Sequence, residues 1–158
     1  MKFIALCVAL SACGVEDPEL DSVQTDLQQE AELYCPGVLS SEVTTYRGLT
    51  GIYRRMTATA VGEPLKLTLF AYRDDPDARG TFSGYETGET GLPAPYGGNF
   101  AAIPDNPAIG AAFVLDTNSD GEYDKLYFVL GMTRAFGLVQ NLCMIGGDHP
   151  FVMQRSLY

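Results

Sequence analysis

Two apolar runs on either side of a short polar segment constrain the fold of this chain more than any other feature. The runs are Ala111–Leu115 and Leu126–Leu130, and the segment between them, Asp116–Asp124, is rich in Asp, Asn, Ser and Gly. Short apolar runs bounded by turn-forming residues are typical of β-strands. Residues 111–131 therefore predict a β-hairpin, in which an acidic loop joins two strands.

The rest of the chain from Tyr34 onward has the same character, because short strand-like segments alternate with turns and no long stretch has helical periodicity. The expected strands are Thr44–Ala60, Leu65–Tyr72, Gly80–Thr87, Asn99–Ile103, the two runs of the hairpin, Ala135–Ile145 and Phe151–Arg155. Seven or eight strands at this spacing predict an all-β fold over residues 34–158, an antiparallel barrel or sandwich of about 7–8 strands.

One segment between the expected strands, Gly88–Asn106, has an irregular composition. It contains Pro93, Pro95 and Pro104 together with four glycines, so only Asn99–Ile103 is expected to form a short strand within it. Long irregular loops in compact domains are often functional, for example as lids. Tyrosines would then line a ligand pocket beside this segment at the mouth of a barrel, or the aromatic residues would simply fill a core.

Scattered strand residues resemble those of lipocalin-like barrels. They are Leu49, Gly51 and Tyr53, the run Gly80–Gly84, and the terminal Phe151–Arg155. The Trp-containing motif in the first strand of true lipocalins is missing, because the chain contains no Trp. The resemblance implies a small β-barrel and does not extend to a family signature.

The charge balance excludes one class of function. The chain has 10 basic and 20 acidic residues, a net charge of −10, whereas nucleic-acid binders need a basic footprint. Seven of the acidic residues and none of the basic ones lie in residues 14–33. The acidity therefore belongs partly to an N-terminal segment. No segment has the run of about 18–20 apolar residues that a membrane-spanning helix requires.

The N-terminus has the organisation of a secretory signal peptide, because Lys2 precedes an apolar run, Phe3–Leu10, and small residues follow. The alternative is a buried apolar strand or helix at the start of the domain. The run ends in a motif that resembles the bacterial lipobox, an aliphatic residue and two small residues before a cysteine: Leu10-Ser11-Ala12-Cys13.

The lipobox resemblance implies a lipoprotein of the bacterial cell envelope. Residues 1–12 would be the signal peptide, and Cys13 would be acylated and become the first residue of the mature protein, so the membrane would be a partner through the lipid anchor. Gly14 stands where inner-membrane lipoproteins often have Asp. The resemblance therefore favours the outer membrane, on either its periplasmic or its surface face.

Residues 13–33 are predicted to form a flexible, lipidated tether. The segment is polar, acidic and free of aromatic residues, so it buries too little apolar surface to offset the entropy of ordering. A coil of about 20 residues has a mean reach of roughly 25 Å, enough to lift a small domain off the headgroups. The alternative is a short helix through Asp26–Leu33, with Leu27 and Leu33 docked on the domain.

The four cysteines have different expected roles. Cys7 lies in the signal peptide and Cys13 is the lipidation site, which leaves Cys35 and Cys143. Outside the inner membrane the compartment is oxidising, so the two remaining cysteines are expected to form a disulfide. The alternative is two buried free thiols.

The acidic loop has the oxygen-ligand spacing of a calcium site, with oxygen-bearing side chains at its positions 1, 3, 5 and 9 and Gly121 at position 6. Hard oxygen ligands in a flexible ring suit Ca²⁺. The loop resembles the strand–loop–strand calcium loops of FG-GAP-type repeats, although it occurs here once. The resemblance implies a ligand set of Asp116, Asn118, Asp120, Asp124 and the main-chain carbonyl of Glu122.

The other interpretation of the acidic loop is an ordinary hairpin turn, because Asn, Asp, Ser and Gly all favour turns. Four carboxylates crowd into nine residues, and a cation would ease their repulsion. Both interpretations stay open at this point, and a bound calcium ion would have a structural role.

No catalytic motif is recognisable. The only His, His149, follows Asp148 in the Gly-rich segment Gly146–Pro150. A turn between the last two strands explains this segment, and a general base is the alternative. The chain contains no nucleophile elbow, zinc-protease motif or P-loop. We therefore expect no catalytic residues and a protein that is not an enzyme.

These observations together predict a lipid-anchored envelope lipoprotein with a non-catalytic binding domain. The expected partner is a small ligand or another protein, and not nucleic acid. The alternatives are a structural or assembly accessory protein stabilised by calcium and, last, a hydrolytic enzyme.

Overall fold

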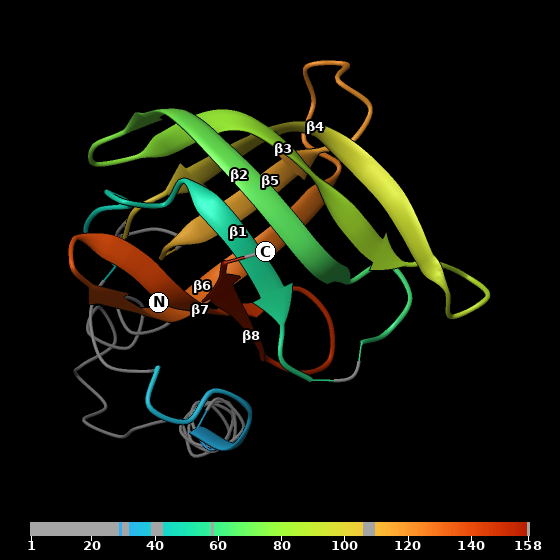
Figure 1. The fold of residues 1–158 in the computed structure, drawn as a ribbon, viewed down its shortest axis with the longest axis horizontal. Helices are drawn as coiled ribbons and strands as arrows, with labels where there is room; N and C mark the ends of the chain where they lie inside the picture. The colour runs from blue at the N-terminus through green and yellow to red at the C-terminus, as the bar shows by residue number, and fades with distance from the viewer. Residues whose placement is uncertain (1–28, 30–31, 39–42, 58, 106–109, 158) are drawn as a thin grey trace, which may run out of the picture.

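The computed structural model describes residues 29, 32–38, 43–57, 59–105 and 110–157. Within these ranges eight antiparallel strands form one closed barrel, in which each strand pairs with the next and β8 pairs with β1 (Figure 1). The strands are β1 (Gly51–Arg55), β2 (Pro64–Asp74), β3 (Ala78–Thr87), β4 (Pro93–Ile103), β5 (Ala112–Asp116), β6 (Lys125–Ala135), β7 (Leu138–Ile145) and β8 (Phe151–Ser156). The predicted all-β antiparallel fold is confirmed, and it is a barrel.

Alternate residues along the strands point into the barrel and form its core. In β3, Ala78, Gly80 and Phe82 are buried, whereas the residues between them are exposed. Phe100 and Phe113 stack within the same core at a centroid distance of 5.5 Å. An eight-stranded barrel is just wide enough for side chains to fill. The buried side chains of the described strands form one continuous apolar cluster in this space.

One end of the barrel is covered by residues 43–50. Three hydrogen bonds hold this segment to the connections at that end: Tyr46 N donates to Pro76 O (2.8 Å), Asp105 N donates to Val43 O (2.7 Å) and Val139 N donates to Gly48 O (3.0 Å). We call this the closed end; it also carries the β2–β3, β4–β5 and β6–β7 connections. The opposite end, with the β1–β2, β3–β4, β5–β6 and β7–β8 connections, is the open end.

The prediction of a single strand over Thr44–Ala60 was therefore wrong outside β1. Tyr46 and Leu49 are fully buried at the closed end, and Tyr46 Oη donates to Ile103 O (3.1 Å). Gly48 has a φ of +82°, and a Cβ there would overlap the carbonyl oxygen of Gly137. The chain turns at Gly48 to cover the barrel, which a continuous strand would not do.

Arg155 on β8 completes the closed end. Its Nε donates to Val139 O (2.6 Å), its Nη1 to Thr50 O (3.0 Å), and its Nη2 to Gly48 O (2.8 Å) and Tyr53 Oη (2.9 Å). One guanidinium thus donates to three main-chain carbonyls and one hydroxyl at this end of the barrel.

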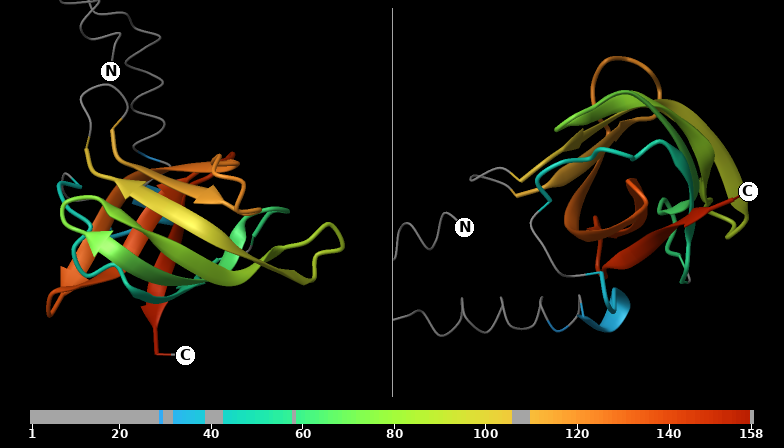
Figure 2. Two further views of the ribbon diagram at one scale, coloured as in Figure 1. Left: turned by 90° about the horizontal axis from the view of Figure 1, so that it is seen from above. Right: turned by 60° about the vertical axis from the view of Figure 1, so that its left-hand side comes forward.

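β4 overturns the prediction that Gly88–Asn106 is mostly irregular. The strand pairs with β3 from Pro93 to Ala102, whereas its pairing with β5 begins only at Asn99. Figure 2 shows the β3–β4 hairpin extending beyond the barrel. Pro93 and Pro95 therefore lie where the strand has a partner on one side only, and a free edge is where a sheet tolerates the missing N–H of proline.

The segment Ala135–Ile145, predicted as one strand, contains a turn. Ala135 at the end of β6 pairs with Leu138 at the start of β7, so Phe136 and Gly137 form a two-residue hairpin loop. Both have positive φ, 54° and 77°, as a type I′ turn requires.

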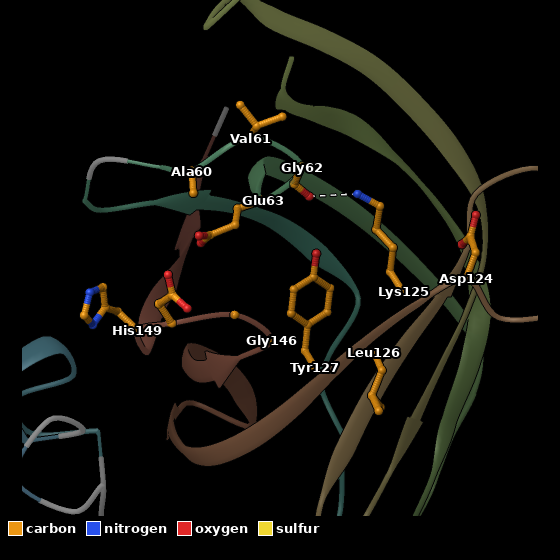
Figure 3. Close-up of a pocket in the computed structure, with 12 residues that line it drawn as sticks. Ala60, Val61, Gly62, Glu63, Asp124, Lys125, Leu126, Tyr127, Gly146 and His149 are labelled. Atoms are coloured by element: carbon orange, nitrogen blue, oxygen red, sulfur yellow. Dashed lines mark hydrogen bonds between the residues drawn. The ribbon is translucent and has the colours of Figure 1, made fainter. Parts of the chain in front are cut away.

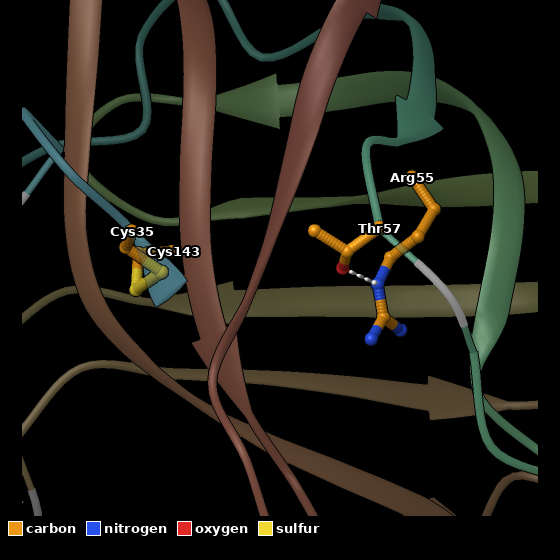
Figure 4. Close-up of a disulfide and its surroundings, with 4 residues drawn as sticks. All are labelled: Cys35, Arg55, Thr57 and Cys143. Atoms are coloured by element: carbon orange, nitrogen blue, oxygen red, sulfur yellow. Dashed lines mark hydrogen bonds between the residues drawn. A yellow bond between two sulfur atoms is a disulfide. The ribbon is translucent and has the colours of Figure 1, made fainter. Parts of the chain in front are cut away.

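The predicted disulfide between Cys35 and Cys143 is present (Figure 4), with 5.9 Å between the two Cα atoms. Both cysteines are fully buried and pack with Val38, Val152 and the partly buried Leu130. This small cluster is separate from the barrel core, so the disulfide fastens the N-terminal segment to the outside of the barrel wall.

The predicted signal peptide, the lipidation site Cys13 and most of the tether lie outside the described residues. Glu32, Leu33 and Tyr34 are helical, as the helix alternative for the end of the tether expected. The side chain of Leu33 is 72% exposed, however, so it does not dock on the barrel. No helix in the described part of the chain is long and apolar enough to cross a membrane.

Candidate functional site

Three segments at the open end surround a pocket of about 540 Å³ (Figure 3). They are residues 60–63 of the β1–β2 connection, residues 124–127 at the start of β6, and residues 146–149 of the β7–β8 connection. These segments are far apart in sequence, and barrel closure brings them together at one end.

Tyr127 lies at the base of this pocket. Its ring packs edge to face against Phe151 at 5.8 Å, and its hydroxyl points into the pocket between Glu63 and Lys125 (Figure 3). Burial, and then the nearby carboxylates of Glu63 and Glu86, raise the pKa of Tyr127 above its ordinary value of 10.0. The hydroxyl therefore stays protonated and is available to donate a hydrogen bond.

The two cations beside the pocket are both neutralised. Arg55 forms a 2.6 Å ion pair with Glu63 and lies 4.0 Å from the centroid of the Phe151 ring. Lys125 forms a 2.5 Å ion pair with Glu86 and donates to Gly62 O at 2.8 Å. Each pair is only partly accessible to solvent, since the four side chains are between 6% and 25% exposed.

Tyr96 contributes a buried hydroxyl with no hydrogen-bond partner in the described structure. Its ring packs edge to face against Phe82 at 5.1 Å, and Lys125 Nζ lies 5.7 Å from the ring centroid. Burial raises the pKa of Tyr96, and Tyr127 and Glu86 raise it further. Buried polar atoms are nearly always paired, so an unpaired hydroxyl close to Lys125 marks this end of the barrel as different from the core.

The candidate acid–base residues Asp148 and His149 lie at the rim of the pocket and are exposed. The ring of His149 stacks on Tyr34 at 4.9 Å, which ties the β7–β8 connection to the N-terminal segment. Asp148 makes no hydrogen bond or ion pair with any described residue. The sequence thus correctly placed this segment in a turn between the last two strands, and the absence of catalysis stays a prediction.

In the acidic loop, Asp116 is 2% exposed at the end of β5. Its Oδ2 accepts from Gly121 N (2.9 Å) and its Oδ1 from Asp120 N (3.2 Å). Burial alone would raise its pKa, but hydrogen bonds from these amides, from the Asn118 amide and from the Asn99 side chain outweigh burial and lower it.

The remaining predicted calcium ligands also bond within the loop. Asn118 Oδ1 accepts from Asp120 N (3.3 Å), Asp120 Oδ1 accepts from Glu122 N (2.9 Å), and Asp124 accepts from both the amide (3.0 Å) and the hydroxyl of Thr117. Among the described residues, no three His, Cys, Asp or Glu side chains are grouped to hold a metal ion. The loop's side-chain oxygens accept hydrogen bonds from the loop itself, as in an ordinary turn, and calcium binding stays a prediction.

Four residues of the site, Glu63, Tyr96, Lys125 and Tyr127, were not predicted from the sequence. The sequence of β6 contains a signal for two of them. Lys125 and Tyr127 face inward, whereas the apolar Leu126 and Phe128 are 50% and 41% exposed, which reverses the usual pattern of apolar residues inside and polar residues outside. A charged residue on the inward face of a strand is unusual and marks the barrel end.

Comparison of the chain with protein-family models, with curated proteins and with solved structures finds no match. The function is therefore inferred from the geometry of the site and from the N-terminal motif.

Proposed function

We propose that this protein is a lipid-anchored lipoprotein of the bacterial outer membrane, and that its barrel is a non-catalytic module that binds a small ligand at the open end. The observation that carries the binding role is the pocket of about 540 Å³ above Tyr127. This volume lies within the range of small-molecule sites, roughly 300–1,000 Å³.

The chemistry of the pocket favours a small polar ligand with a cationic group. Arg55 and Lys125 are already paired with carboxylates, so neither offers a free positive charge. Asp148 at the rim has no cationic partner among the described residues, and the Tyr127 hydroxyl is available at the base. A primary amine or guanidinium at the rim, attached to a polar group that reaches Tyr127, would satisfy both.

The lipobox at Cys13 supports the anchor, and the disulfide independently supports export to an oxidising compartment. Disulfides persist in oxidising compartments such as the periplasm and the cell surface. The Cys35–Cys143 bridge also secures the point at which the tether joins the domain, so the domain and its anchor remain linked through a fixed attachment.

The ligand proposal is tested by native mass spectrometry of the mature lipoprotein released from detergent. Gly147 lines the pocket, and a Cβ added there would have no atom within 4 Å, so Gly147→Trp adds a large ring to the pocket lining without a backbone clash. Leu92→Trp places the same ring on the exposed β3–β4 loop as a control. We expect a co-purified small-molecule mass in the wild type and in Leu92→Trp that is lost in Gly147→Trp.

A titration with putrescine as a cationic probe, read as a thermal shift, tests the charge preference. Asp148→Asn should weaken the apparent affinity roughly fivefold, the value of a solvent-exposed ion pair. A bare polypeptide mass in all three proteins together with no response to putrescine would contradict the proposal.

The second candidate function is a structural accessory stabilised by calcium. Four carboxylates within nine residues of one loop favour it, and Asp116, Asn118, Asp120, Asp124 and the Glu122 carbonyl would be the ligands. A melting temperature that rises in Ca²⁺ and falls after chelation, in the wild type and not in Asp120→Ala, would support this role.

A further inference from the structure

Phe136 occupies the tip of the β6–β7 hairpin at the closed end, and its side chain is completely exposed. Leu138, two residues further on, is 42% exposed. The tip therefore presents an aromatic and an aliphatic side chain to solvent on either side of Gly137, at the end of the barrel opposite the pocket.

The backbone at Phe136 makes this placement costly for the isolated protein. Its φ of 54° lies in the left-handed region, which Asn and Gly enter easily and a bulky residue rarely does. Type I′ hairpin loops favour Asn-Gly for this reason, and this loop has Phe-Gly. Strained, non-glycine positions of this kind persist most often where they serve a function.

The hairpin is held firmly, so the exposed ring is presented on a rigid support. Arg134 donates through Nε to Arg47 O (3.2 Å) and through Nη2 to Thr45 O. Val139 N donates to Gly48 O (3.0 Å) on the other strand of the hairpin. Both strands are therefore fixed to residues 43–50, and the tip projects from a braced base.

We infer that Phe136 contacts the lipid bilayer to which the protein is anchored, and that the closed end of the barrel faces the membrane. This inference rests on the proposed lipid anchor. Inserting a Phe side chain into the apolar part of the interface is worth on the order of tenfold to a hundredfold in partitioning. An anchored domain that otherwise tumbles freely would be oriented by a preference of this size.

The length of the chain between anchor and barrel permits this contact. Cys13 lies 16 positions before residue 29, the first described helical residue, and the coil predicted for that stretch would have a mean reach of roughly 20 Å. Phe136 lies seven positions before Cys143 along the hairpin, on the order of 23 Å away if that path is extended. The tether can therefore bring the tip to the headgroups without being fully extended.

Facing the closed end to the bilayer leaves the pocket directed away from it. Exposed apolar residues also occur at the open end, for example Leu92 at 68% and Val61 at 61% exposed. Neither has a left-handed backbone, so neither is held exposed at the cost seen at Phe136. Leu92 is the appropriate position for comparison.

The test uses the absence of Trp from the chain. Phe136→Trp and Leu92→Trp each introduce a single indole at opposite ends of the barrel. The acylated full-length product of each is reconstituted into vesicles of phosphatidylethanolamine and phosphatidylglycerol, with and without brominated acyl chains. We expect the indole at position 136 to shift its emission to shorter wavelength and to be quenched by bromine, while the indole at position 92 stays accessible to aqueous acrylamide.

Each outcome decides a separate question. An indole at position 136 that stays accessible to acrylamide, in protein that floats with the vesicles, overturns the inference and leaves the anchor intact. If the intact mass lacks acyl groups and the protein does not float, the anchor itself fails. Protection at position 136 in native envelope vesicles but not in pure lipid assigns the tip to a protein partner and also overturns the inference.

Phe136→Asn separates membrane contact from folding. Asn suits the type I′ turn, so this variant should fold at least as well as the wild type. It should nevertheless lose the fixed orientation of the barrel on the membrane. A Trp reporter at position 138 (Leu138→Trp, in the Phe136→Asn background) should then be accessible to acrylamide. Unchanged protection of that reporter would count against a specific role for Phe136.

Discussion

The two ends of the barrel are built from the same eight strands and satisfy their polar groups in opposite ways. At the closed end, residues 43–50 cross the opening and Arg155 donates to three main-chain carbonyls and to Tyr53. At the open end, the ion pairs of Arg55 and Lys125 flank a pocket, and the Tyr96 hydroxyl has no partner among the described residues. The polar groups of the closed end are bonded within the chain, whereas the open end contains a buried hydroxyl without a hydrogen-bond partner among the described residues.

This difference indicates a division of roles within a small fold. Completed hydrogen bonds fix the closed end and give a stable base. The unpaired Tyr96 hydroxyl lowers stability at the open end, where the Tyr127 hydroxyl in the pocket is a group with which a ligand could bond. The following predictions test whether the two ends contribute differently to stability, as this contrast implies.

The largest expected effect comes from the disulfide, which lies on the barrel wall and belongs to neither end. Replacing Cys35 and Cys143 together by Ala should lower the free energy of unfolding by about 4–5 kcal/mol on the chain-entropy model for a loop of this length, since the two cysteines are 108 residues apart. Urea denaturation measures the loss. Hydrogen exchange should show both ends losing protection together, and a loss confined to one end would contradict a role shared by both.

The next effect contrasts the two ends directly. Arg155→Met should cost about 3 kcal/mol, because it removes four hydrogen bonds from one charged donor at the closed end. Lys125→Met at the open end removes a partly solvated pair and should cost about 1 kcal/mol, since Glu86 is 25% exposed. Equal losses in urea denaturation would show that the two ends contribute alike and that the comparison is wrong.

A smaller effect concerns the acidic loop at the open end. The pKa values of Asp116 and Asp124 are both lowered from 3.8, so the stability that their ionised forms contribute is complete above pH 3.8 and is lost as the pH falls through their folded-state values. Thermal melts between pH 5 and pH 2 measure this loss. Asp116→Asn should flatten the pH dependence, and an unchanged slope would show that the loop does not contribute.

The smallest effect is a gain. Phe136→Asn relieves a left-handed backbone at a bulky residue and should raise stability by about 0.5–1 kcal/mol. Phe136→Ala at the same site is the control, because it removes the ring and keeps an unsuited backbone. If the two variants melt at the same temperature, the turn is not strained at Phe136.

The sequence predicted those parts of the molecule in which a local pattern agrees with the tertiary structure. The hairpin of residues 111–131 was clear because turn-forming residues separate two apolar runs, and these residues form β5 and β6. The disulfide followed from the two cysteines left after the N-terminal motif was assigned. In both cases the residues that form the feature can be recognised from the sequence alone.

The errors occurred where tertiary context overrides the local pattern. Pro93 and Pro95 suggested a loop, but a strand with one free edge accepts them. The hairpin turn at Phe136 was not predicted, because a bulky apolar residue seldom adopts a left-handed backbone conformation. The pocket was not predicted, since its three lining segments come together only when β8 pairs with β1.

With the lipid anchor proposed above, the unpaired half of β4 also bears on how many copies of the protein one membrane could hold. Anchored molecules diffuse in two dimensions, where encounters are frequent, and an open strand edge is a template on which a neighbouring chain can add a strand. Pro93 and Pro95 remove two N–H donors from this stretch, so a second copy finds few bonds to make there. The prolines that obscured the strand thus protect this edge against edge-to-edge aggregation.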